Sequence, residues 1–169
     1  MGRLTDAALL DRVQRETLRY FTDFAHPASS MARERYGTPG MDDTVTTGGT
    51  GFGIMAIIAG AERGFISGTE AADRIAAICH HLETAPRYRG AFAHWMDGRT
   101  AATVFFSPKD DGGDIVETAF LMMGLITARQ YLQASAPGIA RRIDSLWRDV
   151  DWAGFCPAPD AMYWHWSPT

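Results

Sequence analysis

Hydrophobic residues recur at three- and four-residue steps along much of the chain, which is the spacing of an amphipathic helix. The first such segment begins at Thr5 or Asp6, either of which can cap a helix. Its inward-facing positions are predicted to be Leu9, Leu10, Val13, Thr17, Tyr20, Phe21 and Phe24. Similar single stripes predict helices over 67–84, which Ser67 and Glu70 would open as a capping box, and over 137–150.

Two further segments, 50–63 and 114–132, keep no polar face at all. A helix that is apolar on every side is buried on every side, so these two are predicted to lie inside the other three. The first follows the glycine-rich run 46–51, and Gly64 is expected to terminate it. This alternation predicts an all-α toroid of antiparallel helix hairpins in two layers rather than a four-helix bundle.

If neighbouring helices are antiparallel, the two inner helices are parallel and their N-termini open on the same end of the molecule. A functional site is therefore expected at that end. Residues 26–40, rich in Pro, Ser and Gly, are predicted to form a loop. Residues 91–106 lose the helical period, and Asp97-Gly98 between 92–95 and 103–106 predicts a small β-hairpin insertion.

Composition narrows the possible partners and compartments. The chain has 169 residues, 46% of them hydrophobic, and a net charge of −4 without any run of Lys or Arg, so one domain and no nucleic-acid partner are expected. Cys79 and Cys156 lack metal-ligand spacing and are expected to be free thiols. No signal peptide or membrane span is predicted. We expect a cytoplasmic location, or a periplasmic one if an export signal lies upstream.

The strongest chemical signal is the acidic run 109–117, which directly precedes the second apolar helix. Asp114 and Glu117 share a helix face, and Asp110 lies four residues before Asp114, across a double glycine that is expected to turn the backbone. The alternative is that these acids only complement the helix dipole. Glycoside hydrolases act through a pair of carboxyl groups. The candidate catalytic residues are therefore Asp110, Asp114 and Glu117. The candidate sugar-binding residues are Thr46, His94, Trp95, Lys109, Asp111, Trp164 and Trp166.

Four separated segments, 46–53, 62–67, 110–119 and 147–152, resemble the glycoamylase-like glycoside hydrolases. The resemblance implies an (α/α)6 barrel that acts on β-1,2-glucans, by endo cleavage or by release of sophorose, with inversion and without a metal or other cofactor. It places Asp110, Asp114 and Glu117 among the candidate catalytic residues of the family.

The resemblance also implies that residues 1–169 are the N-terminal portion of a single catalytic domain, because five predicted helices are fewer than half of such a barrel. We therefore expect an incomplete toroid with an open flank, through which the chain could associate, and no activity for these residues alone. A further carboxylate of the family would lie outside them. The expected partner is an oligo- or polysaccharide.

Two other functions remain open at this point. The chain could be a non-catalytic, truncated helical module that binds sugar or a protein partner. Less favoured is a magnesium-dependent enzyme similar to terpenoid synthases, because residues 110–114 fit the Asp-Asp-x-x-Asp pattern and acidic oxygens suit that ion.

Overall fold

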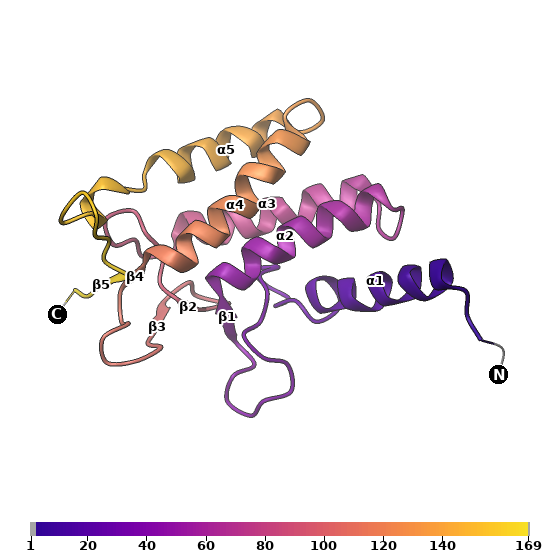
Figure 1. Ribbon diagram of the computed structural model, residues 1–169, viewed down its shortest axis with the longest axis horizontal. Coiled ribbons are helices and arrows are strands. Elements are labelled where there is room, and N and C mark those ends of the chain that lie inside the picture. The colour runs from indigo at the N-terminus through magenta and orange to yellow at the C-terminus, as the bar shows by residue number, and fades with distance from the viewer. Residues whose placement is uncertain (1–2, 169) are drawn as a thin grey trace.

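The computed structural model describes residues 3–168 and is mostly helical (Figure 1). The helices are α1 (Asp6–Thr22), α2 (Thr47–Glu62), α3 (Gly68–Thr84), α4 (Ile115–Leu132) and α5 (Pro137–Arg148), with a short 3-10 turn at Ala153–Phe155. The strands are β1 (Thr44–Thr46), β2 (Trp95–Asp97), β3 (Thr103–Val104), β4 (Gly113–Asp114) and β5 (His165–Trp166). All five predicted helices are present.

The predicted helix ends are also found. The Thr5 hydroxyl accepts a hydrogen bond from the Ala8 N–H and caps α1, and the Ser67 hydroxyl accepts one from the Glu70 N–H and caps α3. Gly64 has φ +67° directly after α2, the left-handed conformation that commonly ends a helix. Local capping chemistry therefore sets these boundaries.

Helices α2 and α4 are parallel neighbours, as predicted (Figure 1). The Gly48 N–H near the start of α2 donates to Glu117 near the start of α4, and the Tyr131 hydroxyl donates to Glu62 at the far ends. Both pairs are 69 residues apart in sequence, so the two helices run in the same direction and in register. Their N-termini consequently lie together at one end of the molecule.

The glycine-rich run was expected before α2, but Thr47 and the glycines after it form the first turns of that helix. Their role is close approach. A Cβ atom at Gly51 would overlap the Phe120 carbonyl, and one at Gly124 would overlap the Gly51 carbonyl. The backbones of α2 and α4 therefore touch, which only glycine permits.

Burial confirms the two-helix core only in part. Ile57 and Leu125 are fully buried, but Phe52 and Phe120 are 48% and 39% exposed, against the expectation of burial all round. Leu10 of α1 is 60% exposed, so the predicted inward stripe of α1 is also wrong in its first half. These side chains belong to one flank of α1, α2 and α4 that no described residue covers. We call it the open flank.

The open flank is continuous between α1 and α2. Val13 of α1 and both Ala56 and Ala59 of α2 line one cavity of about 390 Å³. The rings of Phe52 and Phe120 touch beside it, with centroids 5.4 Å apart, and connect α2 to α4. An uncovered flank was expected for an incomplete toroid. Closure of the ring is not visible in residues 3–168.

The β structure is larger than the predicted hairpin. Strands β2 and β3 pair antiparallel around the Asp97-Gly98 turn as expected, although residues 92–94 and 105–106 are not part of them. The unpredicted strand β1 pairs with β2 in register Val45↔Met96. A second unpredicted pair joins β4 to β5, with Asp114 opposite His165. Both small sheets lie at the end where α2 and α4 begin (Figure 1).

Two smaller expectations can be compared directly. Cys79 and Cys156 are free thiols, the first buried and the second exposed, as predicted. Across the described residues, every helix is too short or too polar to span a bilayer.

We predict that Gly51→Ala lowers the free energy of unfolding by about 2–3 kcal/mol, because the added methyl group forces the backbones of α2 and α4 apart. The matched control is Gly68→Ala in α3, where a Cβ atom meets nothing within 4 Å. That change is expected to be neutral or to stabilise by up to about 1 kcal/mol. Denaturant unfolding of both variants measures the difference. Equal effects at the two positions would contradict the proposed contact.

Candidate active site

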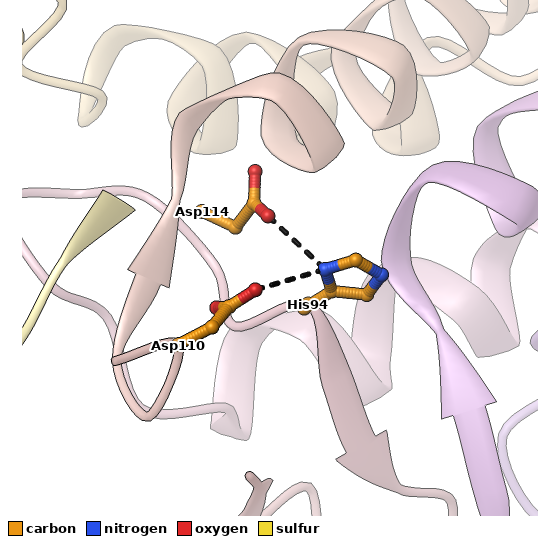
Figure 2. Close-up of side chains that lie close together, drawn as sticks. All are labelled: His94, Asp110 and Asp114. Atoms are coloured by element: carbon orange, nitrogen blue, oxygen red, sulfur yellow. Dashed lines mark hydrogen bonds and ion pairs between the residues drawn. The ribbon is translucent and has the colours of Figure 1, made fainter. Parts of the chain in front are cut away.

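The acidic residues meet where the N-termini of α2 and α4 and the two small sheets come together. Asp114 is the N-cap of α4, Glu117 is in the first turn of that helix, and Asp110 closes a turn with Ser107. His94 directly precedes β2 and points at both aspartates (Figure 2). Three separate segments therefore converge on one cluster.

His94 is the centre of this cluster. Its Nδ1 lies 3.1 Å from Asp110 Oδ2 and 3.1 Å from Asp114 Oδ2 (Figure 2). The ring stacks on Phe106 with centroids 4.2 Å apart and meets the edge of Trp95. Its Nε2 has no hydrogen-bond partner among residues 3–168 and is the ring nitrogen left for a ligand.

The neighbouring carboxylates keep His94 protonated. Burial of the ring lowers its pKa, but the hydrogen bond with Asp114 and the negative charges of Glu117, Asp114 and Asp110 outweigh burial and raise the pKa to about 9. At neutral pH the side chain is therefore an imidazolium, which donates from both ring nitrogens.

Asp114 is a fixed anion. It is fully buried, and its Oδ1 accepts the N–H groups of Val116 and Glu117 at 2.9 Å each. Its Oδ2 accepts from His94 and from the Trp164 indole, both at 3.1 Å. Burial alone would raise the pKa of Asp114, but these bonds from His94, the Glu117 N–H and Trp164 lower it overall. Asp114 therefore both caps α4 and belongs to the acidic cluster.

Glu117 and Asp110 are shifted in the opposite direction. Burial raises the pKa of Glu117, although its Oε2 accepts the Gly48 N–H at 2.7 Å. Burial and the charge of Asp114 raise the pKa of Asp110, whose Oδ1 is buried without a partner among the described residues. The cluster therefore holds two carboxyl groups with raised pKa values beside one whose pKa is lowered. Neither Asp114 nor Glu117 pairs with a Lys or Arg in the described part of the chain.

Four of the candidate sugar-binding residues lie around this cluster. Trp164 is 62% exposed while its indole N–H holds Asp114, and His94 and Trp95 precede and begin β2. Trp166, in β5, packs its ring on Tyr88 with centroids 5.9 Å apart. Whether these residues bind sugar remains a prediction.

The other three candidates are Asp111, Lys109 and Thr46. Asp111 accepts a hydrogen bond from the Ser167 hydroxyl at 2.7 Å. Lys109 is exposed and has no ion pair among residues 3–168. Thr46 is the last residue of β1. Its methyl group lies so close to Gly49 that a Cβ atom on Gly49 would displace it. A role of Thr46, Lys109 and Asp111 in binding also stays a prediction.

Several residues that shape the site were missed from the sequence. Strand β5 carries Trp164 to Asp114 through an antiparallel pairing that no local pattern announces. Gly112 was expected to turn the chain, but it is needed because a Cβ atom there would overlap the Trp166 carbonyl. Phe106 and Gly48 were read only as parts of a strand and of a glycine run. Their roles depend on contacts made across the fold.

The same cluster offers a possible cation site. His94, Asp110 and Asp114 each present one ligand atom, and these atoms lie within 4.8 Å of one another. A shared proton on His94 Nδ1 already explains why the two carboxylates approach it so closely. The absence of a metal stays a prediction from the sequence.

Comparison with known proteins shows which enzymes the chain is similar to. No family model matches the chain. The chain is 48% identical, over 98% of its length, to an exo β-1,2-glucooligosaccharide sophorohydrolase (non-reducing end) of Parabacteroides distasonis, of which it spans 23%. The structure aligns over 98% of its length with an endo-β-1,2-glucanase from Chitinophaga pinensis, solved with sophorotriose and glucose, at TM-score 0.95 and 41% identity. It covers 42% of that chain.

A β-1,2-glucanase from Parabacteroides distasonis gives TM-score 0.92 and 47% identity over 99% of the chain, which covers 25% of that structure. Over nearly all of its length, the chain is therefore similar to a part of proteins named as a sophorohydrolase and as β-1,2-glucanases. The resemblance seen in the sequence motifs is confirmed, because the chain is homologous over its whole length to a part of the β-1,2-glucan-degrading enzymes.

We predict that the His94 imidazole titrates at a pH of about 9 in the folded chain. Asp114→Asn removes a hydrogen bond and a charge that raise this pKa, so the midpoint should fall toward the ordinary value of 6.5. NMR of the imidazole carbon-bound protons measures it directly. Asp144→Asn in α5, far from His94 in the fold, is the control and should leave the midpoint unchanged.

The same shift links stability to pH. Because the folded-state pKa of His94 is raised, its protonation contributes stability that is fully present below pH 6.5 and is lost as the pH rises through about 9. His94→Gln should abolish this component when urea unfolding is compared on either side of that range. An unchanged pH dependence in the variant would show that the imidazolium does not hold the two aspartates.

Proposed function

We propose that the chain contributes the acid side of the active site of a hydrolase that cleaves β-1,2-linked glucans. The observation that carries the proposal is the opposed pKa shifts of Glu117 and Asp114 within one buried cluster. Adjacent carboxyl groups whose environments push their pKa values apart are typical of acid–base catalysis. The named relatives act on β-1,2-linked glucose chains, which supplies the substrate class.

Glu117 is assigned as the general acid. It is half-buried with a raised pKa, and its Oε1 makes no hydrogen bond within the described chain, so a proton can be held there and passed to the glycosidic oxygen. Asp114 remains charged and, together with His94, fixes the position of the surrounding groups. The Nε2–H of His94 is free to donate to a sugar hydroxyl.

Hydrolysis also needs a base that takes a proton from the attacking water. Asp110 and Asp114 are both engaged with the His94 imidazolium, which opposes this role. We therefore assign the base to a carboxylate outside residues 1–169. On this proposal the chain is one portion of a catalytic domain, and the open flank of α1, α2 and α4 packs against further helices that complete an (α/α)6 toroid.

The other two functions are less well supported. A non-catalytic module is not favoured, because the relatives are named as enzymes and the chain retains the acidic cluster. A terpenoid-synthase-like enzyme is opposed by the position of the acidic run, which forms a turn and strand β4 instead of a helix. Tight, stoichiometric binding of magnesium in a calorimetric titration would favour that enzyme over the hydrolase.

We predict that Glu117→Gln abolishes hydrolysis in a chimera in which residues 1–169 replace the matching segment of the Parabacteroides distasonis relative. Loss of the proton donor should lower kcat by about two to four orders of magnitude on β-1,2-glucooligosaccharides. Glu16→Gln, on the exposed face of α1, is the matched control and should retain activity. A Glu117→Gln chimera that cleaves at the parental rate would remove Glu117 from the mechanism.

The 169-residue chain alone is predicted not to hydrolyse β-1,2-glucan. Without a base and without the remaining wall of the groove, the substrate is not held in a reactive position. Chromatography of the reaction mixture would detect released sophorose or longer products. Released sophorose or longer products would contradict this prediction. Gel filtration would then show whether copies of the chain associate, as they could through the open flank.

A further inference from the structure

A second hollow lies beside the sheet of β1, β2 and β3, away from the acidic cluster. It has a volume of about 490 Å³ and lies between the loop that follows α1 and the turn that joins β2 to β3. This volume is in the range of small-molecule sites. We call it the loop cavity; its lining includes His26, Arg33, Tyr36, Asp42, Asp43 and Arg99.

The floor of the loop cavity is rigid. The His26 ring is buried, with Nε2 3.2 Å from Asp43 Oδ1 and Nδ1 3.4 Å from the Ser29 hydroxyl. Gly98 packs on the ring so tightly that a Cβ atom there would lie 2.6 Å from it. The order Ser29–His26–Asp43 resembles a nucleophilic triad, but Ser29 is fully buried and its hydroxyl accepts the Met31 N–H. The arrangement therefore positions the cavity wall and does not form a nucleophile.

The polar groups of the loop cavity are balanced in charge. Arg33 donates from Nε to the Phe24 carbonyl and from Nη1 to the Asp42 carbonyl, and its Nη2 makes no hydrogen bond to the described residues. Arg99 donates from Nε to Asp43, and its two terminal nitrogens make no hydrogen bond within residues 3–168. The lining thus carries two guanidinium groups and two carboxylates, whose formal charges cancel, so a neutral ligand with many hydroxyl groups fits better than an anion.

An aromatic face completes this chemistry. Tyr36 is 59% exposed, and its ring rests on Phe24 with centroids 4.5 Å apart. An exposed ring held by a second ring offers a flat apolar surface beside hydrogen-bonding groups. The apolar face of a pyranose ring can stack on such a surface while its hydroxyls reach the arginines and aspartates.

The loop between α1 and β1, which lines the loop cavity, leads to the end of the molecule where α2 begins (Figure 1). The Gly98 N–H donates to the Asp43 carbonyl at 2.7 Å, and His94 lies four residues earlier on the same segment. At about 3.3 Å per residue, the Cα atoms of His94 and Gly98 are up to about 13 Å apart. A single sugar ring does not bridge that distance, whereas an oligosaccharide does.

We infer that the loop cavity is a sugar-binding subsite that holds a glucosyl unit of an oligosaccharide at a distance from the acidic cluster. The inference rests on the proposed function for the linkage of the sugar, and on the cavity itself for its position and chemistry. Tyr36 supplies the stacking surface, and Arg33 and Arg99 supply the free donors.

The test is an NMR titration of the isotopically labelled 169-residue chain with sophorotriose, the β-1,2-linked trisaccharide. Amide signals of Tyr36, Asp43 and Arg99 should shift in a saturable manner. Tyr36→Ala should weaken the affinity by about fivefold to tenfold, whereas Tyr36→Phe should retain it. Tyr131→Ala, at the opposite end of α4, is the matched control and should have no effect.

Each outcome decides the inference. Shifts confined to His94 and residues 110–117, or no saturable shift at millimolar trisaccharide, would overturn it. Inorganic phosphate that shifts the cavity signals when sophorotriose does not would show an anion site instead. Saturable shifts at the cavity together with full activity of the Glu117→Gln chimera would keep the subsite and reject the assigned acid.

Discussion

The close packing of α2 on α4 determines where Asp114 and Glu117 lie relative to the start of α2. The two backbones touch at Gly51 and Gly124, which holds the helices in register and brings both N-termini to one end. Gly48 then reaches Glu117, and a Cβ atom at Gly48 would lie 2.6 Å from Glu117 Oε2. A wider separation would break this bond. The glycines that let the two helices pack closely therefore also set the position of the Glu117 carboxyl group.

Three carboxyl groups in a small buried volume repel one another, and the fold offsets that repulsion in two ways. The His94 imidazolium lies between Asp110 and Asp114, while the first-turn N–H groups of α4 hold the other oxygen of Asp114. Asp114 therefore remains ionised even though it is fully buried. Its fixed charge raises the pKa of Asp110 and contributes to that of Glu117. Different protonation behaviour arises from position, since the carboxyl groups are chemically alike.

Much of the helical fold could be predicted because its signals are local. Capping at Thr5 and Ser67, the stop at Gly64 and the unbroken apolar segments each depend on neighbouring residues in the sequence. The parallel pairing of α2 and α4 followed from the alternation of helix types. The exposure of Phe52 and Leu10 could not be read in the same way, because the pattern shows which faces are apolar but not whether a partner covers them.

The sequence indicated which residues form the site better than it indicated what each of those residues contacts. Asp110, Asp114, Glu117 and His94 do converge, yet nothing in the sequence indicated that His94 Nδ1 would lie between two carboxylates. That position depends on β1 pairing with β2 and on stacking with Phe106, both of which join segments distant in sequence. Trp164 reaches Asp114 only through the pairing of β4 with β5. Such long-range pairings leave no periodic signal.

The acidic cluster and the open flank differ in how far the chain itself satisfies their contacts. Asp114 has all its hydrogen-bond partners within this chain, and so does the Nδ1 of His94. No residue among 3–168 packs over the exposed apolar surface of α1, α2 and α4. The acid side of the site is therefore organised by contacts that do not depend on the flank, whereas apolar area on the flank is stabilised only when something covers it. It follows that the charges and proton positions of the cluster are set by contacts within residues 3–168, whether or not anything covers the open flank.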